Sequence, residues 1–266
     1  MRNALAIAKK ELSIYFTTPI AYVVFAAMTV IASYFFIAAI KQFSEASMMA
    51  MQMPQYADPN RLNLTDHVIA PVVFNMGIFF AFVTPLVSMR LLAEEKKQKT
   101  FELLMTAPVR PWEIVLGKYL GGLVIMLLTV ALLMVLPFIL DSFAASAGSG
   151  GAGGIEWQTT LAAYFGLFLW SAMALALGLF ISSLTDSQIV AAIISILLLL
   201  LLWLATWMAG GLEGVPRDVI SYLSASQHLV AFVRGIFNLQ DLFYYLSWIV
   251  LAVFLTHRAV EAQRWA

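Results

Sequence analysis

The sequence contains no cysteine and few charged residues. The missing cysteine excludes a disulfide framework, thiolate chemistry and Cys-ligated zinc. Charged residues make up 11% of the 266 residues, whereas an ordinary soluble domain carries about 25%. The 15 Lys and Arg balance the 15 Asp and Glu, so no charge excess indicates a nucleic-acid partner. Histidine is also scarce, with three residues that lie far apart in the sequence: His67, His228 and His257.

Several catalytic signatures are missing as well. The phosphate-binding pattern G-x-x-x-x-G-K-[ST] is absent, because Gly117-Lys118 lacks both the upstream glycine and a following Ser or Thr. Neither H-E-x-x-H nor G-x-S-x-G occurs, so a metalloprotease or serine hydrolase would lack its signature. We therefore expect no catalytic residue, no cofactor and no bound metal in this chain.

What the sequence has in excess is apolar side chains, which make up 62% of the residues. Uncharged runs of about 18 or more such residues are typical of transmembrane helices. We therefore expect an all-α polytopic membrane protein with six transmembrane helices. Their predicted positions are about 20–41, 68–90, 116–140, 160–183, 187–210 and 238–257. The sixth uncharged run covers only 242–256, so this helix spans the bilayer if it begins near Asn238.

The centres of these predicted spans carry no ionisable residue. Ion-coupled carriers normally keep one there, and charge-lined pores need several. The absence predicts that any driving energy arrives from outside the bilayer.

The distribution of basic residues predicts the orientation. With the N-terminus in the cytoplasm, 11 Lys and Arg lie inside and 4 lie outside, so both termini are expected to be cytoplasmic. Residues 1–18 then form an amphipathic helix on the inner surface, and Pro19 allows a bend into the first span. Its apolar face is predicted to contain Leu5, Ala8, Leu12 and Tyr15. The alternative is that this segment is simply the solvated start of the first span.

Two predicted outer loops contain patterns that resemble ligand sites. Residues 41–67 are expected to form a small outer helix followed by a turn, with a cluster of methionines: Met48, Met49, Met51 and Met53. Such a cluster suggests a soft metal such as Cu(I), but methionine also fills apolar surfaces, and neither His nor Cys joins it. Residues 148–153 spell G-x-G-x-x-G, but without a βαβ unit they are expected to be a flexible linker.

The predicted inner loop, residues 91–112, contains the most informative pattern. Glu94 and Glu95 precede Lys97 and Lys99 at spacings that suit helix ion pairs. Thr100 is placed to cap a second short helix over about 101–106, with Glu102 in its first turn. That helix would expose four apolar side chains: Phe101, Leu103, Leu104 and Met105. They would rest on lipid or enter the groove of a soluble partner.

The last predicted outer loop, residues 213–240, is apolar but too short to span. We expect a re-entrant helical hairpin that is broken near residues 235–238 and caps a path through the protein. The candidate gate residues are His228, Phe232, Arg234 and Asp241. Arg234 is expected to pair with Asp241 or with a partner subunit; the alternative is that it snorkels to lipid phosphate.

Two pairs of small residues predict close helix approach. They are Gly117-x-x-x-Gly121 and Ala174-x-x-x-Gly178. Such pairs are frequent in membrane helices, so they do not by themselves indicate a dimer.

Four segments together resemble a known family. They are KKELSIYFTTPIAYVV, SMRLLAEEKKQKTFELLMTAPVRPWEIVLGKYLG, ALGLFISSLTDSQIVAA and SASQHLVAFVRGIFNLQDLFYYL. In this order they resemble an ABC-2 type transporter permease, and most of all the branch named after the gliding-motility permease. The resemblance covers essentially the whole chain. The family usually has Gly before the Thr of the inner loop, where this sequence has Lys99.

The resemblance implies a fold, a location and partners. The fold would be a six-helix ABC-2 bundle of the type V exporter kind in a bacterial inner membrane, paired with a second copy or a paralogue. A cytoplasmic ABC ATPase would hold ATP and Mg, and an auxiliary membrane protein with a large outer domain often accompanies this branch. The ATPase would dock on a coupling helix, whose matching positions here are Glu94, Glu95, Thr100, Phe101, Glu102, Leu103, Leu104 and Met105.

The expected function is therefore that of the permease subunit of an ABC transporter, which moves a substrate when the partner hydrolyses ATP. One alternative is a mechanotransmission subunit that uses the same parts and moves no solute. An intramembrane enzyme is a third interpretation, which the missing catalytic signatures make less favourable.

Overall fold

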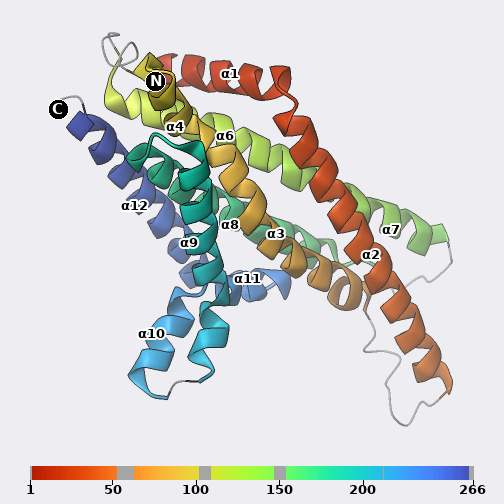
Figure 1. The fold of residues 1–266 in the computed structure, drawn as a ribbon. Helices are drawn as coiled ribbons and strands as arrows, with labels where there is room; N and C mark the ends of the chain where they lie inside the picture. Colours follow the sequence, from red (N-terminus) through yellow and green to blue (C-terminus); the bar gives the residue numbers. More distant parts are fainter. Residues whose placement is uncertain (1, 53–62, 102–108, 147–153, 212, 264–266) are drawn as a thin grey trace.

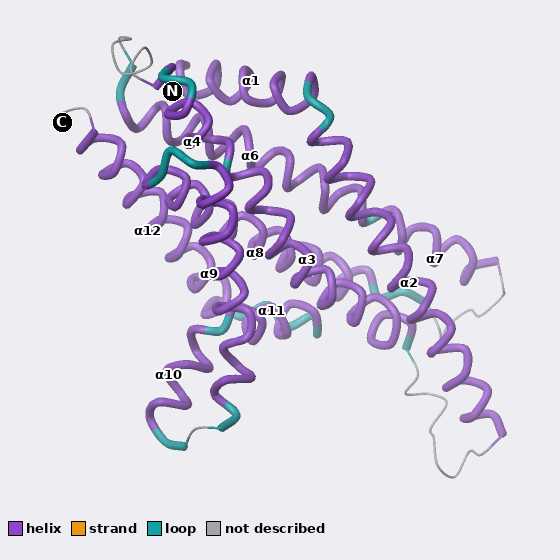
Figure 2. Tube along the Cα trace, in the orientation of Figure 1, coloured by secondary structure: helices purple, strands orange, loops and turns teal. Residues whose placement is uncertain are grey.

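The protein is an all-helical bundle. The computed structural model describes residues 2–52, 63–101, 109–146, 154–211 and 213–263, and no β-strand occurs in these ranges (Figure 2). Six helical stretches are long and apolar enough to cross a membrane: Ile20–Ala50, Thr65–Lys97, Pro111–Phe143, Trp157–Leu184, Gln188–Ala209 and Leu239–Gln263. The prediction of an all-α protein with six transmembrane helices is confirmed.

Both chain termini lie at one end of the bundle, which we call the terminal end (Figure 1). There, α1 (Arg2–Thr17) crosses the bundle before α2 (Ile20–Gln52) runs away from it. The middle of the chain forms a short π-helix η2 (Thr65–Ile69), α3 (Ala70–Ser88), α4 (Arg90–Lys97), α6 (Pro111–Leu133) and α7 (Val135–Ser146). The last helices are α8 (Trp157–Leu184), α9 (Gln188–Ala209), α10 (Val215–Leu223), α11 (Ala225–Val233) and α12 (Leu239–Gln263).

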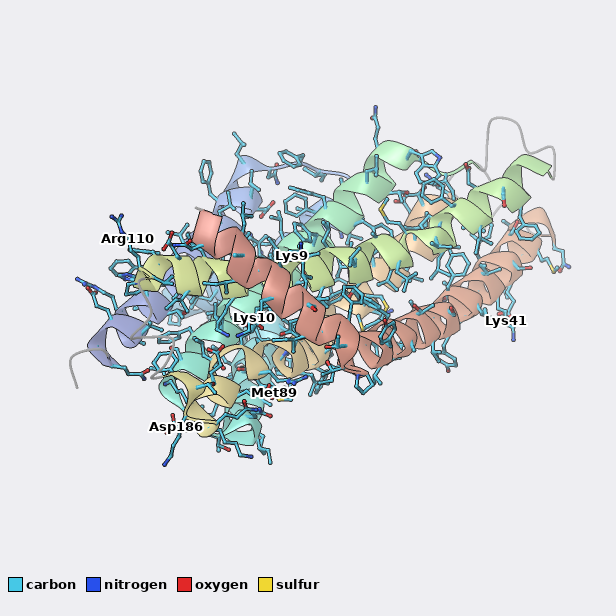
Figure 3. The ribbon with its side chains drawn as sticks, turned by 90° about the horizontal axis from the view of Figure 1, so that it is seen from above. Lys9, Lys10, Lys41, Met89, Arg110 and Asp186 are labelled. Carbon is cyan, nitrogen blue, oxygen red and sulfur yellow. The ribbon has the colours of Figure 1, made fainter. Side chains whose placement is uncertain are left out.

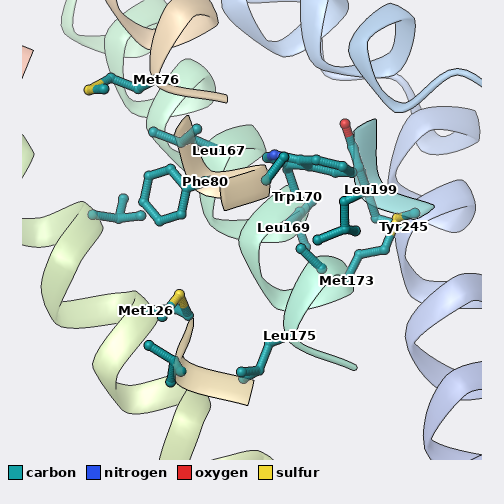
Figure 4. Packing of buried hydrophobic residues seen from close by; sticks show 14 of the residues in the cluster. Met76, Phe80, Met126, Leu167, Leu169, Trp170, Met173, Leu175, Leu199 and Tyr245 are labelled. Carbon is teal, nitrogen blue, oxygen red and sulfur yellow. The ribbon is translucent and has the colours of Figure 1, made fainter. Parts of the chain in front are cut away.

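Helix α8 is the centre of the bundle. Most of its side chains are buried, and it packs against α3, α6, α9, α11 and α12. The fully buried Trp170 is at its middle (Figure 4). The indole N–H of Trp170 donates to the carbonyl oxygen of Gly77 at 2.8 Å, and its ring lies 5.3 Å from that of Trp203. A buried indole needs such an acceptor, so this contact joins α8, α3 and α9.

The first spanning helix is longer than predicted. α2 continues without a break for 33 residues, a length of about 50 Å at 1.5 Å per residue, whereas the hydrocarbon core is about 30 Å thick. The separate small helix predicted after residue 41 is therefore wrong, because the helix is uninterrupted from Ile20 to Gln52. The side chains of Met48 and Met49 on this extension are exposed, and Met53 lies outside the described residues.

The third spanning segment consists of two helices. α6 begins with Pro111 in its first turn, as the sequence predicts, because a missing N–H costs nothing there. The chain is interrupted at Met134, three residues before Pro137. A proline inside a helix cannot donate to the carbonyl four residues earlier and collides with it, which accounts for the separation of α7 from α6. The glycine-rich residues 148–153 lie outside the described residues.

Candidate functional site

Helix α1 packs on α6 through small residues. The buried positions of α1 are Ala4, Ala8, Glu11 and Tyr15. The predicted apolar face was therefore partly wrong, since Leu5 is 65% exposed. The face of α1 that is buried is the one that packs on the glycines of α6.

The two glycines of the pair 117 and 121 both face α1. A Cβ atom added at Gly117 would lie 2.7 Å from the Cβ of Ile7, and one added at Gly121 would lie 2.7 Å from the Cβ of Glu11. These separations are far below van der Waals contact, so only glycine fits. The predicted close approach occurs within the chain, between α6 and α1.

A buried cluster of three charges joins α1, α4 and α6, and we call it the Lys118 cluster. Lys118 of α6 is 1% exposed. Its Nζ atom lies 2.8 Å from Oε1 of Glu11 on α1 and 2.9 Å from Oε1 of Glu95 on α4. A buried ammonium needs such partners, because an unpaired charge there would be strongly destabilising. The sequence analysis missed this cluster, since the three residues are far apart in the chain.

The ion pairs predicted along α4 are wrong. Glu94 instead binds Arg90, whose Nε and Nη2 atoms lie 2.7 and 3.2 Å from the two carboxylate oxygens. Glu95 binds Lys118. The predicted partners Lys97 and Lys99 are exposed, and Lys99 lies beyond the end of α4.

Lys99 adopts the left-handed conformation, with a φ of 57°. This places it outside the helical path, where it cannot lie over Glu95. Left-handed backbone is the conformation that favours glycine.

The segment after α4 is described only as far as Phe101. The Thr100 hydroxyl donates to the carbonyl of Glu95 at 3.3 Å. Phe101 was predicted to be exposed, but it is 7% exposed because it packs beneath Lys96, whose Nζ is 5.8 Å from the ring centre. Glu102, Leu103, Leu104 and Met105 lie outside the described residues.

Helix α4 is anchored to the end of α8. The Ser182 hydroxyl accepts from the backbone N–H groups of Leu92 and Ala93 at 3.2 and 3.0 Å, and donates to the carbonyl of Met89. The Lys96 ammonium donates to the carbonyl of Ser183. These bonds satisfy backbone groups that the end of α3 and the start of α4 leave unpaired. The segment that leads into residues 102–108 is thus fixed to α1, α6 and α8.

An open cavity of about 540 Å³ separates α1 from α4 at this end. Figure 3, which views the terminal end, shows α1 with Lys9 and Lys10 crossing above α6. The cavity is lined by Lys10, Glu11, Ile14, Tyr15, Arg90, Glu94, Glu95, Gln98, Thr100 and Lys118. Among the described residues, no group of three or more His, Asp or Glu side chains is arranged to hold a metal ion.

Tyr15 ties the floor of this cavity to α3. Its hydroxyl donates to the carbonyl of Val87 at 2.7 Å. Burial, and to a lesser extent the carboxylate of Glu11, raises the pKa of Tyr15. The hydroxyl therefore keeps its proton and its role as a donor, so α1 is joined to α3 as well as to α6.

The predicted gate residues lie at the opposite end of the bundle, around α10 and α11, which we call the hairpin end (Figure 1). The predicted break near residue 235 is present, because α11 ends at Val233 and α12 begins at Leu239, and a second break at Ser224 separates α10 from α11. The hydroxyls of Ser224 and Ser226 both donate to the carbonyl of Trp203 on α9, which fixes the turn at this point. Gly235, with a φ of 72°, follows the end of α11.

The predicted pairing of these gate residues is wrong in one respect. Asp241 pairs with His228, with 2.5 Å between Oδ1 and Nδ1, and not with Arg234. Arg234 is exposed and forms no ion pair with any described residue. Phe232 is fully buried against α8, where Gly166 leaves space for its ring. His228 and Asp241 are thus brought together, while Phe232 packs on α8 and Arg234 is exposed.

Comparison with known families assigns the chain. Residues 50–256 match the model of the ABC-2 family transporter protein. The chain belongs to the ABC-2 transporter family. The match covers the spanning helices after α2, the last of them as far as residue 256, and it includes Glu95 and Lys118 but not α1. A comparison with curated proteins gives no match.

As a member of the ABC-2 family with six apolar helices, the protein is a multi-pass membrane protein and the membrane subunit of a transporter. The family works with a cytoplasmic ABC ATPase as its partner. The Lys118 cluster is the candidate coupling site, because it joins the segment before residues 102–108 to two other helices.

Proposed function

We propose that the protein couples ATP hydrolysis by a partner ATPase, which binds ATP and Mg, to movement of a substrate across a bacterial inner membrane. The ATPase docks on residues 91–112. The observation that carries this proposal is the Lys118 cluster, in which Glu95 of α4 shares the Lys118 ammonium with Glu11 of α1. A displacement of the docking segment moves α1 and α6 with it.

The anchoring of α4 to α8 supports the same role. Since Ser182 and Lys96 tie α4 to the most buried helix, a movement of α4 reaches the centre of the bundle rather than ending in a flexible loop. Rigid, two-sided attachment of this kind is what a mechanical connection requires. The complete transporter would contain a second copy or a paralogue of this chain, as in the gliding-motility branch, together with an auxiliary membrane protein with a large outer domain.

Replacing Leu104 by aspartate tests the docking step. Leu104 lies outside the described residues, so the prediction comes from the sequence, where Leu104 is one of the apolar positions that match the coupling helix. Losing one buried leucine contact and desolvating a charge costs on the order of 3 kcal/mol, about a hundredfold in affinity. We expect the co-expressed ATPase subunit to be lost from the purified complex, while membrane insertion is unchanged.

The matched control is Ala262→Asp, which places the same charge at an exposed position at the terminal end of α12. Equal recovery of the ATPase with Leu104→Asp and with the parent protein would refute docking at this segment. ATP-dependent movement of a solute into proteoliposomes by the intact complex distinguishes transport from mechanotransmission.

The orientation of the chain is a separate prediction. We propose that the terminal end faces the cytoplasm, because the 11-to-4 bias of Lys and Arg favours it. The chain contains no cysteine, so single cysteines can be introduced without background. We expect Asp218→Cys on α10 to react with an impermeant thiol reagent added to intact spheroplasts, and Gln98→Cys after α4 to be protected until the cells are opened.

Both positions are exposed in the structure, so a difference in labelling reports the side of the membrane and not burial. The reverse pattern would place the docking segment outside the cell and would exclude an ATPase there.

A further inference from the structure

The turn between α10 and α11 is held by side chains of α11 and α12. The Tyr244 hydroxyl donates to the carbonyl of Leu223 at 2.7 Å, and the Tyr245 hydroxyl donates to that of Ala225 at 2.8 Å. Nε2 of His228 lies 2.9 Å from the carbonyl oxygen of Tyr222. The last carbonyls of a helix have no partner within it, so two of these bonds cap the end of α10. The hairpin is thereby tied to the first turns of α12.

Both ring nitrogens of His228 face acceptors. A carbonyl oxygen can only accept, so Nε2 carries a hydrogen. The other nitrogen, Nδ1, lies 2.5 Å from Oδ1 of Asp241. A carboxylate oxygen facing a bare nitrogen lone pair at this distance would be repelled, so a proton lies between them. With that proton bonded to Nδ1 and not to Asp241, the histidine donates from both nitrogens and is an imidazolium.

The surroundings of the ring favour a cation. The Tyr244 ring stacks on the imidazole with 3.9 Å between centres and 19° between planes, so its π face lies against the ring. Tyr222 of α10 approaches edge-on at 5.2 Å, and Tyr245 of α12 lies at 6.4 Å. His228 is 5% exposed and the side chain of Asp241 is 11% exposed. The buried aspartate thus has one cationic partner, on α11.

We propose that His228 and Asp241 form a proton-bridged latch, in which an imidazolium on α11 positions the α10–α11 hairpin against α12. The inference goes beyond ATPase docking, because the latch lies at the hairpin end and the Lys118 cluster lies at the terminal end. When the bridging proton is lost, Nδ1 and Oδ1 repel each other. The hairpin then loses its ionic contact with α12, while the bonds from Tyr244 and Tyr245 persist.

The latch positions the α10–α11 hairpin, which lies in the segment 213–240 that was predicted from the sequence to cap a path through the protein. α10 has no buried residue, whereas His228, Leu229 and Phe232 of α11 are buried. α11 is therefore the part of the hairpin that belongs to the bundle, and His228 is the residue of α11 that reaches both neighbours, α10 and α12. In this role His228 and Asp241 are positioning residues and need not contact a substrate.

Selective ¹⁵N labelling of histidine tests the protonation directly. The sequence has only three histidines, so the His228 signals can be assigned by their loss in His228→Gln. We expect both ring nitrogens of His228 to carry a bonded hydrogen at neutral pH in the full-length protein in nanodiscs. A bare Nδ1 at that pH, with the proton on Asp241 or absent, overturns the proposal. The measurement itself is made on the parent protein. The variant His228→Gln serves only to assign the signals.

Double electron–electron resonance between two spin labels tests whether the latch positions the α10–α11 hairpin against α12. Spin labels at Arg217→Cys on α10 and Gln240→Cys on α12, both exposed positions, should give one narrow distance distribution at neutral pH. We expect the distribution to broaden when the pH is raised until the bridging proton is lost, and to be broad at every pH in His228→Gln. In Asp241→Asn the side-chain amide N–H can donate to a bare Nδ1, so a neutral His228 keeps both bonds and the alkaline broadening should be lost or strongly reduced.

The matched control is His67→Gln. His67 is also near the hairpin end, but it is exposed and its Nδ1 contacts only the carbonyl of Asn63 in its own chain segment, at 3.1 Å. This variant should keep both the narrow distribution and its broadening at alkaline pH. A His228→Gln protein with the parent distribution, or a parent distribution that does not change with pH, contradicts the latch.

Discussion

Replacing Lys118 by methionine is expected to lower the free energy of unfolding by about 3–5 kcal/mol, because removal of one member of a buried ion cluster leaves the others uncompensated. Glu11 and Glu95 would then face each other across the former ammonium site. Their side chains are only 9% and 17% exposed, so water from the neighbouring cavity replaces only part of the lost interaction. Either the carboxylates take up protons or α1 separates from α6, and both outcomes cost stability.

Unfolding of the purified protein in mixed micelles, by titration with a denaturing detergent, measures this loss. Lys97→Met is the matched control, since Lys97 is exposed at the end of α4, and it should change the free energy by less than about 0.5 kcal/mol. The triple variant Lys118→Met, Glu11→Gln, Glu95→Gln removes all three charges and should regain most of the loss. A single variant as stable as the control, or a triple variant no better than the single one, would show that the cluster is not a coupled unit.

The same cluster shows where sequence reasoning fails. The spans were predictable because a helix in lipid must be long and apolar, and that requirement is local. The pairing of Glu11, Glu95 and Lys118 is not local, because positions 11 and 118 meet only after α1 folds back across α6. Glu11 and Lys118 each stand at the edge of an apolar run, whereas Glu95 lies within a charged stretch, and none of these positions indicates its partner.

Helix spacing misled the prediction for Glu94 and Glu95. The rule that residues three and four apart interact holds only while the helix continues. Lys97 is still in α4, but the Glu94 carboxylate is held by Arg90 one turn earlier. Lys99 follows the end of α4 in left-handed backbone and so leaves the face of Glu95. The resemblance to the ABC-2 family contained the missing information, since its usual glycine at this position marks the turn.

The hairpin end shows a related error. Arg234 and Asp241 are opposite charges seven residues apart, which suits two turns of one helix. The chain between them is not helical, because Gly235 takes a φ of 72° and α12 starts at Leu239. Asp241 therefore turns toward α11, where His228 is available. Histidine is counted as neutral at pH 7, so a search for opposite charges did not indicate His228 as the partner of Asp241.

The second small-residue pair leads to the other large expected effect. Gly178 lies on α8 where it crosses α3. A Cβ atom at this position would lie 2.0 Å from Oγ of Ser88 and 2.8 Å from its Cβ. The Oγ atom can rotate away, but the Cβ is bonded to the backbone of α3 and cannot. Any larger residue at 178 must therefore push the two helices apart.

We expect Gly178→Leu to lower the free energy of unfolding by about 3 kcal/mol, the upper part of the usual range for overpacking. The same denaturing-detergent titration measures it, with Gly211→Leu as control, because a Cβ at Gly211 meets no atom within 4 Å. Since Ser182 of α8 holds the start of α4, one turn along the helix from Gly178, the variant should also loosen the docking segment. Faster hydrogen exchange of the Leu92 and Ala93 amides would report this. Unchanged exchange in a protein as stable as the control would mean that α3 and α8 do not approach as closely as Gly178 requires.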